Sequence, residues 1–356
     1  MSFFINGISS LSPQKTFNND GFLDEIISYS SQFLSIVKPN YEVLIPKNKL
    51  IRFSSYMRMG FACAKLALDD AGNCEVDAIV IGSRLGSLVD KNKFLKQLLK
   101  NNETLTSPTS FIYSTHNTIG SQIALALNSN AYNITYSNKN TAFEISLLDS
   151  QLLFNEKKAC NILVGAVDEI TQDNYDKNKI LNIWKEETII NLELFKSNTK
   201  GCLPGEGASF FILSQNKNEN SYAKFIDALL VHEASQPSLI SKLKEFLGQH
   251  FLSMNDIDIV ICGKNGDKAG DEFYNNFCKG CFPNALQVVY KHLIGEHGSA
   301  SSFALWLGSK ILKTKSVPYV VQNNPKDLIK YRNVLLFNFD SFERNDFSFI
   351  LLSNID

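Results

Sequence analysis

The sequence predicts an α/β protein built from two similar halves. Two buried strands recur along the chain: Val76–Gly82 is matched by Ile257–Gly263, and Ser209–Ser214 is matched by Ser348–Ser353. The first pair are nearly continuous apolar runs, which are typical of strands covered on both faces. Alternation of such strands with helical segments favours α/β layers. We therefore expect a pseudo-twofold pair of sheets with helices packed between them.

The helix expected over Ala300–Leu312 is the element around which the other segments are arranged. Its apolar residues fall at helical spacing and also cover its remaining faces, so it should be buried in a large core. Small residues crowd its first turn, where free N–H groups can hold a developing anion. Its counterpart in the first half is the helix expected over Thr141–Phe154.

The other elements follow in chain order. We expect strands at Phe3–Ser9, Tyr41–Leu44, Val76–Gly82, Asn133–Ser137, Asn161–Glu169 and Gly205–Gln215, and helices at Arg52–Ala71, within Ser83–Asn102 and at Ser121–Leu127. Residues 171–200 are polar and irregular, and they are expected to form a cap on the surface. The polar stretch Asn216–Ser221 is the best linker, which divides the chain into 1–215 and 216–356.

Composition excludes several classes of function. The chain has 356 residues and a formal net charge of −1, which gives no case for a nucleic-acid partner. No apolar run approaches the length of a membrane span, and the N-terminus does not resemble a signal peptide. Seven scattered cysteines fit reduced thiols in a cytoplasm. The lone Cys278-Lys-Gly-Cys281 spacing, without nearby histidines, does not indicate a metal site, and no cofactor is expected.

The residues before Ala300 carry a resemblance to a known family. Lys291-His-Leu-Ile-Gly295, followed by Glu296, resembles the Lys-x-x-x-Gly-His segment of β-ketoacyl-ACP synthases. Three further segments resemble landmarks of that family in the same order: Asn133–Ser137 before the nucleophile, Val164–Glu169 at a strand end, and Pro204–Ser209 before the last strand of the first half. The resemblance implies the thiolase-like fold, with five αβαβα layers made from two repeated halves.

The same resemblance implies that the catalytic groups are missing. The nucleophilic cysteine belongs just after the Asn133–Ser137 strand, at Lys139 or Asn140, and neither residue can form a thioester. The first histidine belongs in the stretch that begins at Cys262, and the second is replaced by Glu296, whose carboxylate would repel an enolate. Lys291 is retained. The glycine-rich gate loop is replaced by the bulkier Asn338–Asn345.

The resemblance therefore implies a catalytically silent partner of the chain-length-factor type, most similar to those of aryl-polyene and flexirubin pigment pathways. Such a subunit would pair with an active ketoacyl synthase, as a heterodimer or heterotetramer. It would shape the tunnel for an acyl chain that an acyl carrier protein delivers on phosphopantetheine. The alternative is an active synthase or acyltransferase with a non-standard site that uses His116, Cys262 or His297.

Two pairs of charged residues have simpler interpretations than catalysis. For Lys291 and Glu296, the hypothesis is an internal ion pair in place of the lost chemistry. Asp168 and Glu169 are adjacent on a strand and should point to opposite faces, which argues against joint acid–base work.

Overall fold

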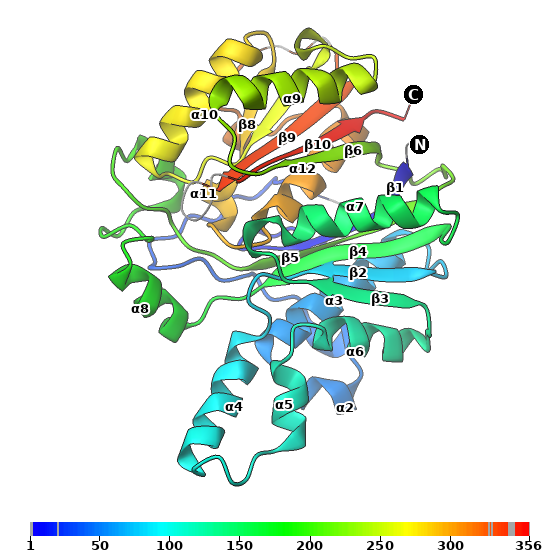
Figure 1. Cartoon of the computed structure of the whole chain (residues 1–356), viewed down its shortest axis with the longest axis vertical. Coiled ribbons are helices and arrows are strands. Elements are labelled where there is room, and N and C mark those ends of the chain that lie inside the picture. The colour runs from blue at the N-terminus through cyan, green and yellow to red at the C-terminus, as the bar shows by residue number, and fades with distance from the viewer. Residues whose placement is uncertain (1–2, 20, 327, 329, 341–345, 356) are drawn as a thin grey trace.

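The fold is a single mixed sheet with helices on both of its faces (Figure 1). The computed structural model describes residues 3–19, 21–326, 328, 330–340 and 346–355, and in these the sheet has ten strands. The strands are β1 (Phe3–Leu11), β2 (Ala78–Gly82), β3 (Tyr132–Tyr136), β4 (Asn161–Asp168), β5 (Gly207–Ser214), β6 (Ala223–Val231), β7 (Ile259–Cys262), β8 (Leu286–Val289), β9 (Asn333–Asp340) and β10 (Asp346–Ser353).

The helices lie between and outside the strands. They are α1 (Tyr41–Leu44), α2 (Lys47–Leu50), α3 (Ser55–Asp70), α4 (Leu88–Lys100), α5 (Pro108–Ser114), α6 (Thr118–Leu127), α7 (Ala142–Asn155), α8 (Gln172–Ile180), α9 (Gln236–Gln249), α10 (Lys268–Cys281), α11 (Lys291–Ile294) and α12 (Ala300–Thr314). Short 3-10 turns occur at η1 (Lys139–Thr141), η2 (Asn191–Lys196), η3 (Met254–Asp256) and η4 (Tyr319–Val321). None of the described helices is both long and apolar enough to cross a membrane.

The strand order is symmetric about the middle of the sheet. It runs β3-β2-β4-β5-β1 and then β6-β10-β9-β7-β8, so each strand of the first half has a counterpart at the mirrored position in the second. The two halves join where β1 pairs antiparallel with β6, so the strands expected to form a pair of sheets form one continuous hydrogen-bonded sheet. The predicted matches of β2 with β7 and of β5 with β10 are confirmed by this order. The predicted division at 215/216 falls in the connection between β5 and β6, and it stays a prediction.

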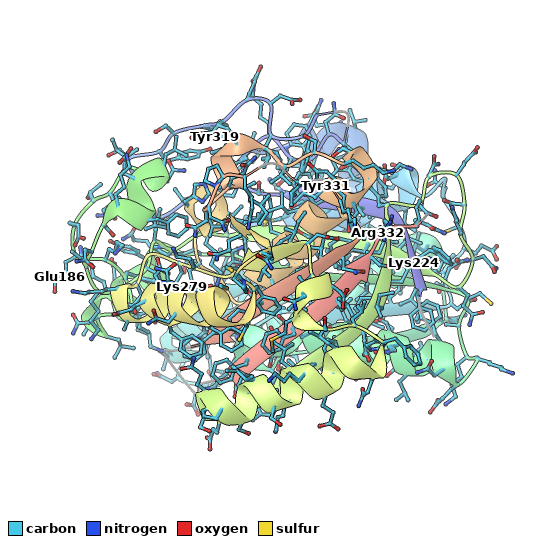
Figure 2. The ribbon with its side chains drawn as sticks, turned by 90° about the horizontal axis from the view of Figure 1, so that it is seen from above. Glu186, Lys224, Lys279, Tyr319, Tyr331 and Arg332 are labelled. Carbon is cyan, nitrogen blue, oxygen red and sulfur yellow. The ribbon has the colours of Figure 1, made fainter. Side chains whose placement is uncertain are left out.

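The molecule has five layers, because two central helices lie between the two halves of the sheet and other helices cover the outer face of each half. The central helices α7 and α12 contact each other and strands of both halves. The outer face of the first half is covered by α3, which packs against β1, β4 and β5. The outer face of the second half is covered by α9 and α10, whose apolar residues share a core with β7, β9 and β10. Figure 2 views the molecule from this side, with Lys279 labelled on α10 and the strands behind.

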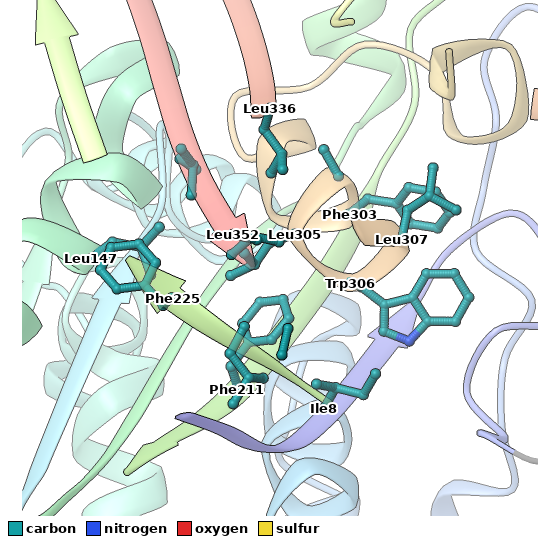
Figure 3. Close-up of a cluster of buried hydrophobic side chains, with 14 of the residues drawn as sticks. Ile8, Leu147, Phe211, Phe225, Phe303, Leu305, Trp306, Leu307, Leu336 and Leu352 are labelled. Atoms are coloured by element: carbon teal, nitrogen blue, oxygen red, sulfur yellow. The ribbon is translucent and has the colours of Figure 1, made fainter. Parts of the chain in front are cut away.

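The prediction that the Ala300–Leu312 helix is buried is confirmed. Every residue of α12 from Ala300 to Leu312 is buried. In Figure 3, its side chains Phe303, Leu305, Trp306 and Leu307 lie among Ile8, Phe211, Phe225, Leu336 and Leu352 from strands of both halves. This helix buries apolar surface on all of its sides, and that burial stabilises the packing of the two halves against each other.

Some local expectations were wrong. Tyr41–Leu44 forms one helical turn rather than a strand, because the Asn40 side chain accepts the Glu42 amide and caps it. The sequence also hid α5, where Ser107 caps a turn that begins with Pro108. The stretch 171–200, expected as an irregular surface cap, contains α8 and η2 and buries Tyr175, Trp184 and Leu194.

Candidate functional site

A small cavity lies where the N-terminal ends of α7 and α12 approach the ends of the strands. Its volume is about 50 Å³, which is enough for a few water molecules. The residues that line it come from both halves of the chain: Arg84, Asn140, Thr141, Ile183, Trp184, Cys202, Asn265, Lys291, Glu296, His297, Gly298, Ala300, Ser301, Asn338, Phe339, Asp346 and Ser348.

Lys291 and Glu296 form a buried ion pair at this cavity. The Lys291 Nζ atom lies 3.0 Å and 2.7 Å from the two carboxylate oxygens of Glu296, and both side chains are largely buried. Asn265 Nδ2 donates to the same carboxylate at 2.8 Å. Both of these partners of the Glu296 carboxylate are donors that the fold holds in place. The ion pair expected from the sequence is confirmed.

The backbone holds this carboxylate in place through two close glycines. Gly295 has a φ of 75°, which favours glycine, and it turns the chain sharply after α11. Gly205 packs so closely that a Cβ atom there would lie 2.0 Å from the Ile294 carbonyl oxygen. The Glu296 amide then donates to the Leu203 carbonyl at 2.7 Å, and the Gly205 amide donates to the Glu296 carbonyl at 3.0 Å. The segment Gly205-Glu206-Gly207 therefore supports the loop that carries Glu296.

Lys139 and Asn140 lie in the turn that leads into α7. Lys139 has a φ of 43°, so this turn is strained for a non-glycine residue. Asn140 lines the cavity, and its Oδ1 atom accepts from Arg84 Nη1 at 3.0 Å. Lys139 is not among the residues that line the cavity. The group that the fold presents at this helix start is thus an amide.

The two histidines considered as substitutes do not meet. His297 lines the cavity, and its Nδ1 atom is 3.2 Å from Ser299 Oγ at the start of α12. Burial, with a smaller effect of Lys291, lowers the pKa of His297 to about 3, so its ring is neutral at pH 7. His116 lies beside Gly86 and outside the lining, and burial followed by Lys91 lowers its pKa.

Two cysteines, Cys262 and Cys202, differ in their position relative to the cavity. The expectation that Cys262 occupies the site was wrong, because β7 turns this side chain into the outer core, 3.4 Å from Sγ of Cys278. Asn265 lines the cavity in its place. Cys202, which the sequence reasoning missed, also lines the cavity but is fully buried, and desolvation raises its pKa well above the usual value. It is therefore a protonated thiol rather than a thiolate nucleophile.

Glu144 was also missed by sequence reasoning. It is a fully buried carboxyl on α7 that accepts from Ser348 Oγ at 2.9 Å, and burial raises its pKa. The available signal was a lone acidic residue inside the apolar run from Ala142 to Leu148. Its hydroxyl neighbour Ser348 lines the cavity, so Glu144 lies just beneath it.

Asp168 and Glu169 do point in different directions, as predicted. Asp168 accepts the Arg84 amide at 2.9 Å, whereas Glu169 accepts Ser55 Oγ at 2.8 Å. Burial raises the pKa of Asp168 to about 6 and the pKa of Glu169 to about 7. Neither lines the cavity, so these carboxyls hold the ends of strands and loops together.

The stretch predicted to replace the gate loop borders the cavity. Asn338, Phe339 and Asp346 line it, and residues 341–345 lie outside the described residues. In the described ranges, no group of His, Cys, Asp or Glu side chains is arranged to hold a metal ion. The residues that line the cavity include two cationic side chains, two anionic side chains, neutral amides, one neutral imidazole and one thiol.

Comparison with known proteins supports the resemblance read from the sequence. Residues 44–185 match the family model "Beta-ketoacyl synthase, N-terminal domain". A search of curated proteins gave no match.

Solved structures share the fold over the whole chain at low sequence identity. A β-ketoacyl synthase from Burkholderia phymatum STM815 superposes with a TM-score of 0.80 at 13% identity, covering 100% of each chain. A ketosynthase in complex with its chain length factor from Xenorhabdus doucetiae gives 0.77 at 14%, covering 99% of this chain and 98% of that one. A type II polyketide synthase acyl carrier protein in complex with its ketosynthase gives 0.78 at 12%, covering 100% and 99%. The thiolase-like fold is therefore established.

Proposed function

We propose that this chain is a non-catalytic subunit of the chain-length-factor type, which pairs with an active ketoacyl synthase. The observation that carries the proposal is the content of the cavity. Where a synthase needs a thiolate and two imidazoles, this chain places an amide at Asn140, a second amide at Asn265 and an ion-paired carboxylate at Glu296. None of these groups can form a thioester, and the Glu296 carboxylate cannot donate a hydrogen bond to an enolate.

An unpaired sheet edge supports the partner. β3 ends the sheet, and in the part of the chain that the structure describes no strand pairs with its outer edge. Large apolar side chains are exposed on β3 and on the helices that pack beside it: Leu125 and Leu127 on α6, Tyr132 on β3, and Leu152 on α7. Such an edge is a template for another chain, and the apolar rim suits a stable interface.

The roles of the complex follow from the pairing. The partner would supply the cysteine and both histidines, and an acyl carrier protein would deliver the acyl chain. This subunit would complete the acyl tunnel and limit product length, in a polyene or fatty-acid type of pathway such as that of aryl-polyene pigments. All seven cysteines are free thiols, which suits a cytoplasmic location.

The alternative is an enzyme with a non-standard site. One observation favours it: Cys202 and His297 line the same cavity. Against it, burial keeps the Cys202 thiol protonated and lowers the pKa of His297 to about 3, so that imidazole is a weak base at pH 7.

The test compares the chain alone with the chain coexpressed beside an intact ketoacyl synthase. We expect the two to copurify, and we expect malonyl-ACP decarboxylation and chain elongation only in the complex. A matched variant carrying Cys202→Ser in this chain should leave the activity of the complex unchanged. Acyl transfer to the isolated chain, or malonyl decarboxylation by it, would overturn the proposal.

A further inference from the structure

Two N–H donors at the cavity, Nε1 of Trp184 and Nδ2 of Asn338, have no hydrogen-bond partner among the described residues, and both residues line the cavity. The hydroxyl of a third lining residue, Ser301, also has no partner, but a hydroxyl can donate or accept, whereas these two N–H groups can only donate. Trp184 is more than nine-tenths buried. A buried N–H group without a partner costs about 1–3 kcal/mol, so two at one cavity need an explanation.

Each donor is held in place by its surroundings. Trp184 packs with Tyr175 and Cys202, and its backbone forms a bridge with Cys202. Asn338 is fixed through its carbonyl oxygen, which accepts from the Tyr290 hydroxyl at 2.8 Å. Burial raises the pKa of Tyr290, so this phenol stays protonated and donates. The amide nitrogen of Asn338 is then the atom left over for the cavity.

The charge of the cavity argues for a neutral ligand. Its lining contains two cationic residues, Arg84 and Lys291, and two anionic residues, Glu296 and Asp346. Lys291 is already neutralised by Glu296, and the Arg84 charge acts on the nearby Asp168 carboxyl. An anion would therefore gain little net attraction, whereas an uncharged carbonyl oxygen can accept from two N–H donors at once.

The geometry points to a carbonyl-binding subsite in which Trp184 Nε1 and Asn338 Nδ2 hold the oxygen of a small acyl thioester or amide. The cavity is large enough for the carbonyl end of such a group. No bond is made or broken, because the cavity offers no ionised nucleophile. The inference rests on the proposed function only for the source of the ligand, namely the acyl chain or the amides of phosphopantetheine.

The indole proton of Trp184 reports directly on binding. The chain has two tryptophans, so protein labelled with ¹⁵N at tryptophan gives two indole signals, and Trp306→Phe assigns them. The isolated full chain would be titrated separately with S-ethyl thioacetate, N-methylacetamide and sodium acetate. We expect a saturable downfield shift of the Trp184 signal with a neutral carbonyl and none at Trp306.

The three probes distinguish the acyl group from phosphopantetheine as the source of the bound carbonyl. A shift with the thioester indicates the acyl group, and a shift with the amide alone indicates phosphopantetheine; both support the subsite. A shift with acetate only, or no shift at any concentration, overturns it and leaves water as the occupant. Copurification with a synthase is measured separately, so a failure here does not depend on the partner.

Variants that remove one donor provide the second readout. Asn338→Asp keeps the acceptor for Tyr290 but removes the amide donor, and we expect at least tenfold weaker binding of the probe. Asn323→Asp, on the segment beside β8, is the matched control and should leave binding unchanged. Equal affinity in Asn338→Asp and the wild type would contradict the assignment.

Discussion

The two halves of the sheet end in equivalent edge strands, β3 and β8, which differ in how far the rest of the chain covers them. β3 closes the first half, and its five side chains are exposed or half-buried. β8 closes the second half, and three of its four side chains are buried. The segment after α12 covers β8: the Asn323 amide donates to the Gln287 carbonyl at 2.9 Å, and Asn324 Oδ1 accepts the Gln287 amide at 2.6 Å. The fold thus covers the β8 edge with its own chain, whereas in the described residues no strand pairs with the outer edge of β3.

The largest expected effect is on the open edge. Replacing both Leu125 and Leu152 by Glu should weaken binding to the partner synthase by about 2 kcal/mol or more, roughly 30-fold, because charges would enter an apolar interface. Both side chains are exposed, so the free energy of unfolding should change by less than about 0.5 kcal/mol.

Copurification and a titration of the labelled partner measure the effect. Phe251→Glu is the matched control, since Phe251 is fully exposed on the turn after α9 in the second half. If the control weakened the complex as much as the double variant, the partner would bind elsewhere and the comparison of edges would fail.

The comparison extends to one buried carboxyl in each half. Glu296, in the second half, is stabilised by a cation, so Glu296→Gln should lower the free energy of unfolding by about 3 kcal/mol by leaving Lys291 unneutralised. Urea denaturation of the variant and the wild type measures this difference in the free energy of unfolding. Asp173→Asn, which removes the acid of the exposed pair with Lys96, should cost less than about 0.5 kcal/mol.

The same variant separates structure from specificity. In the complex, Glu296→Gln is expected to leave the length of the acyl product unchanged, because the ion pair supports the loop rather than the tunnel. A shift in product length without loss of stability would assign Glu296 to the tunnel wall instead.

Asp168, in the first half, accepts the backbone amides of Arg84 and Leu85, and burial outweighs the attraction of the Arg84 cation. Burial raises its pKa from 3.8 to about 6, so the folded state holds the proton more tightly than the unfolded state. Its favourable contribution is complete below about pH 4 and is lost as the pH rises through 6. Relative to wild type, Asp168→Asn should therefore gain up to about 3 kcal/mol between pH 4 and pH 7.

Chemical denaturation across this pH range tests the sign. Glu169→Gln should follow the same course nearly one pH unit higher, since burial raises the pKa of Glu169 to about 7. A difference between variant and wild type that stays flat or falls with pH would mean that Asp168 is ionised in the folded protein.

The smallest effect is expected at the closed edge. Asn324→Ala removes the acceptor for the Gln287 amide and should lower the free energy of unfolding by about 1 kcal/mol. Hydrogen exchange at the Gln287 amide should become faster. Asn323→Ala keeps the backbone hydrogen bond to Gln287, so exchange there should match the wild type; fast exchange in both variants would show that the cover acts as a whole.

Sequence reasoning succeeded where a pattern is local. The apolar run over Ala300–Leu312 predicted a buried helix, because a helix without a polar face must be covered on all sides. The hypothesis that Lys291 and Glu296 form an internal ion pair is also confirmed. The same reasoning failed at Tyr41–Leu44, since one capping side chain decides the conformation of so short a segment.

The composition of the site depended on contacts between distant segments. Trp184 and Cys202 lie in the polar stretch between β4 and β5, and Asn338 lies on β9, so no spacing in the sequence connects them. Cys262 was placed in the site by its position in a motif, but the alternation of side chains along β7 turns it to the opposite face.

Hydrophobic periodicity acts over a few residues at a time, so it was enough to predict the layers, the repetition of the two halves and the burial of the central helix. The polar atoms that meet at the cavity and the sheet edge that stays open could be identified only in the folded chain. Those outcomes depend on how the two halves pack together, and the free energy of that packing comes from contacts between residues far apart in the chain.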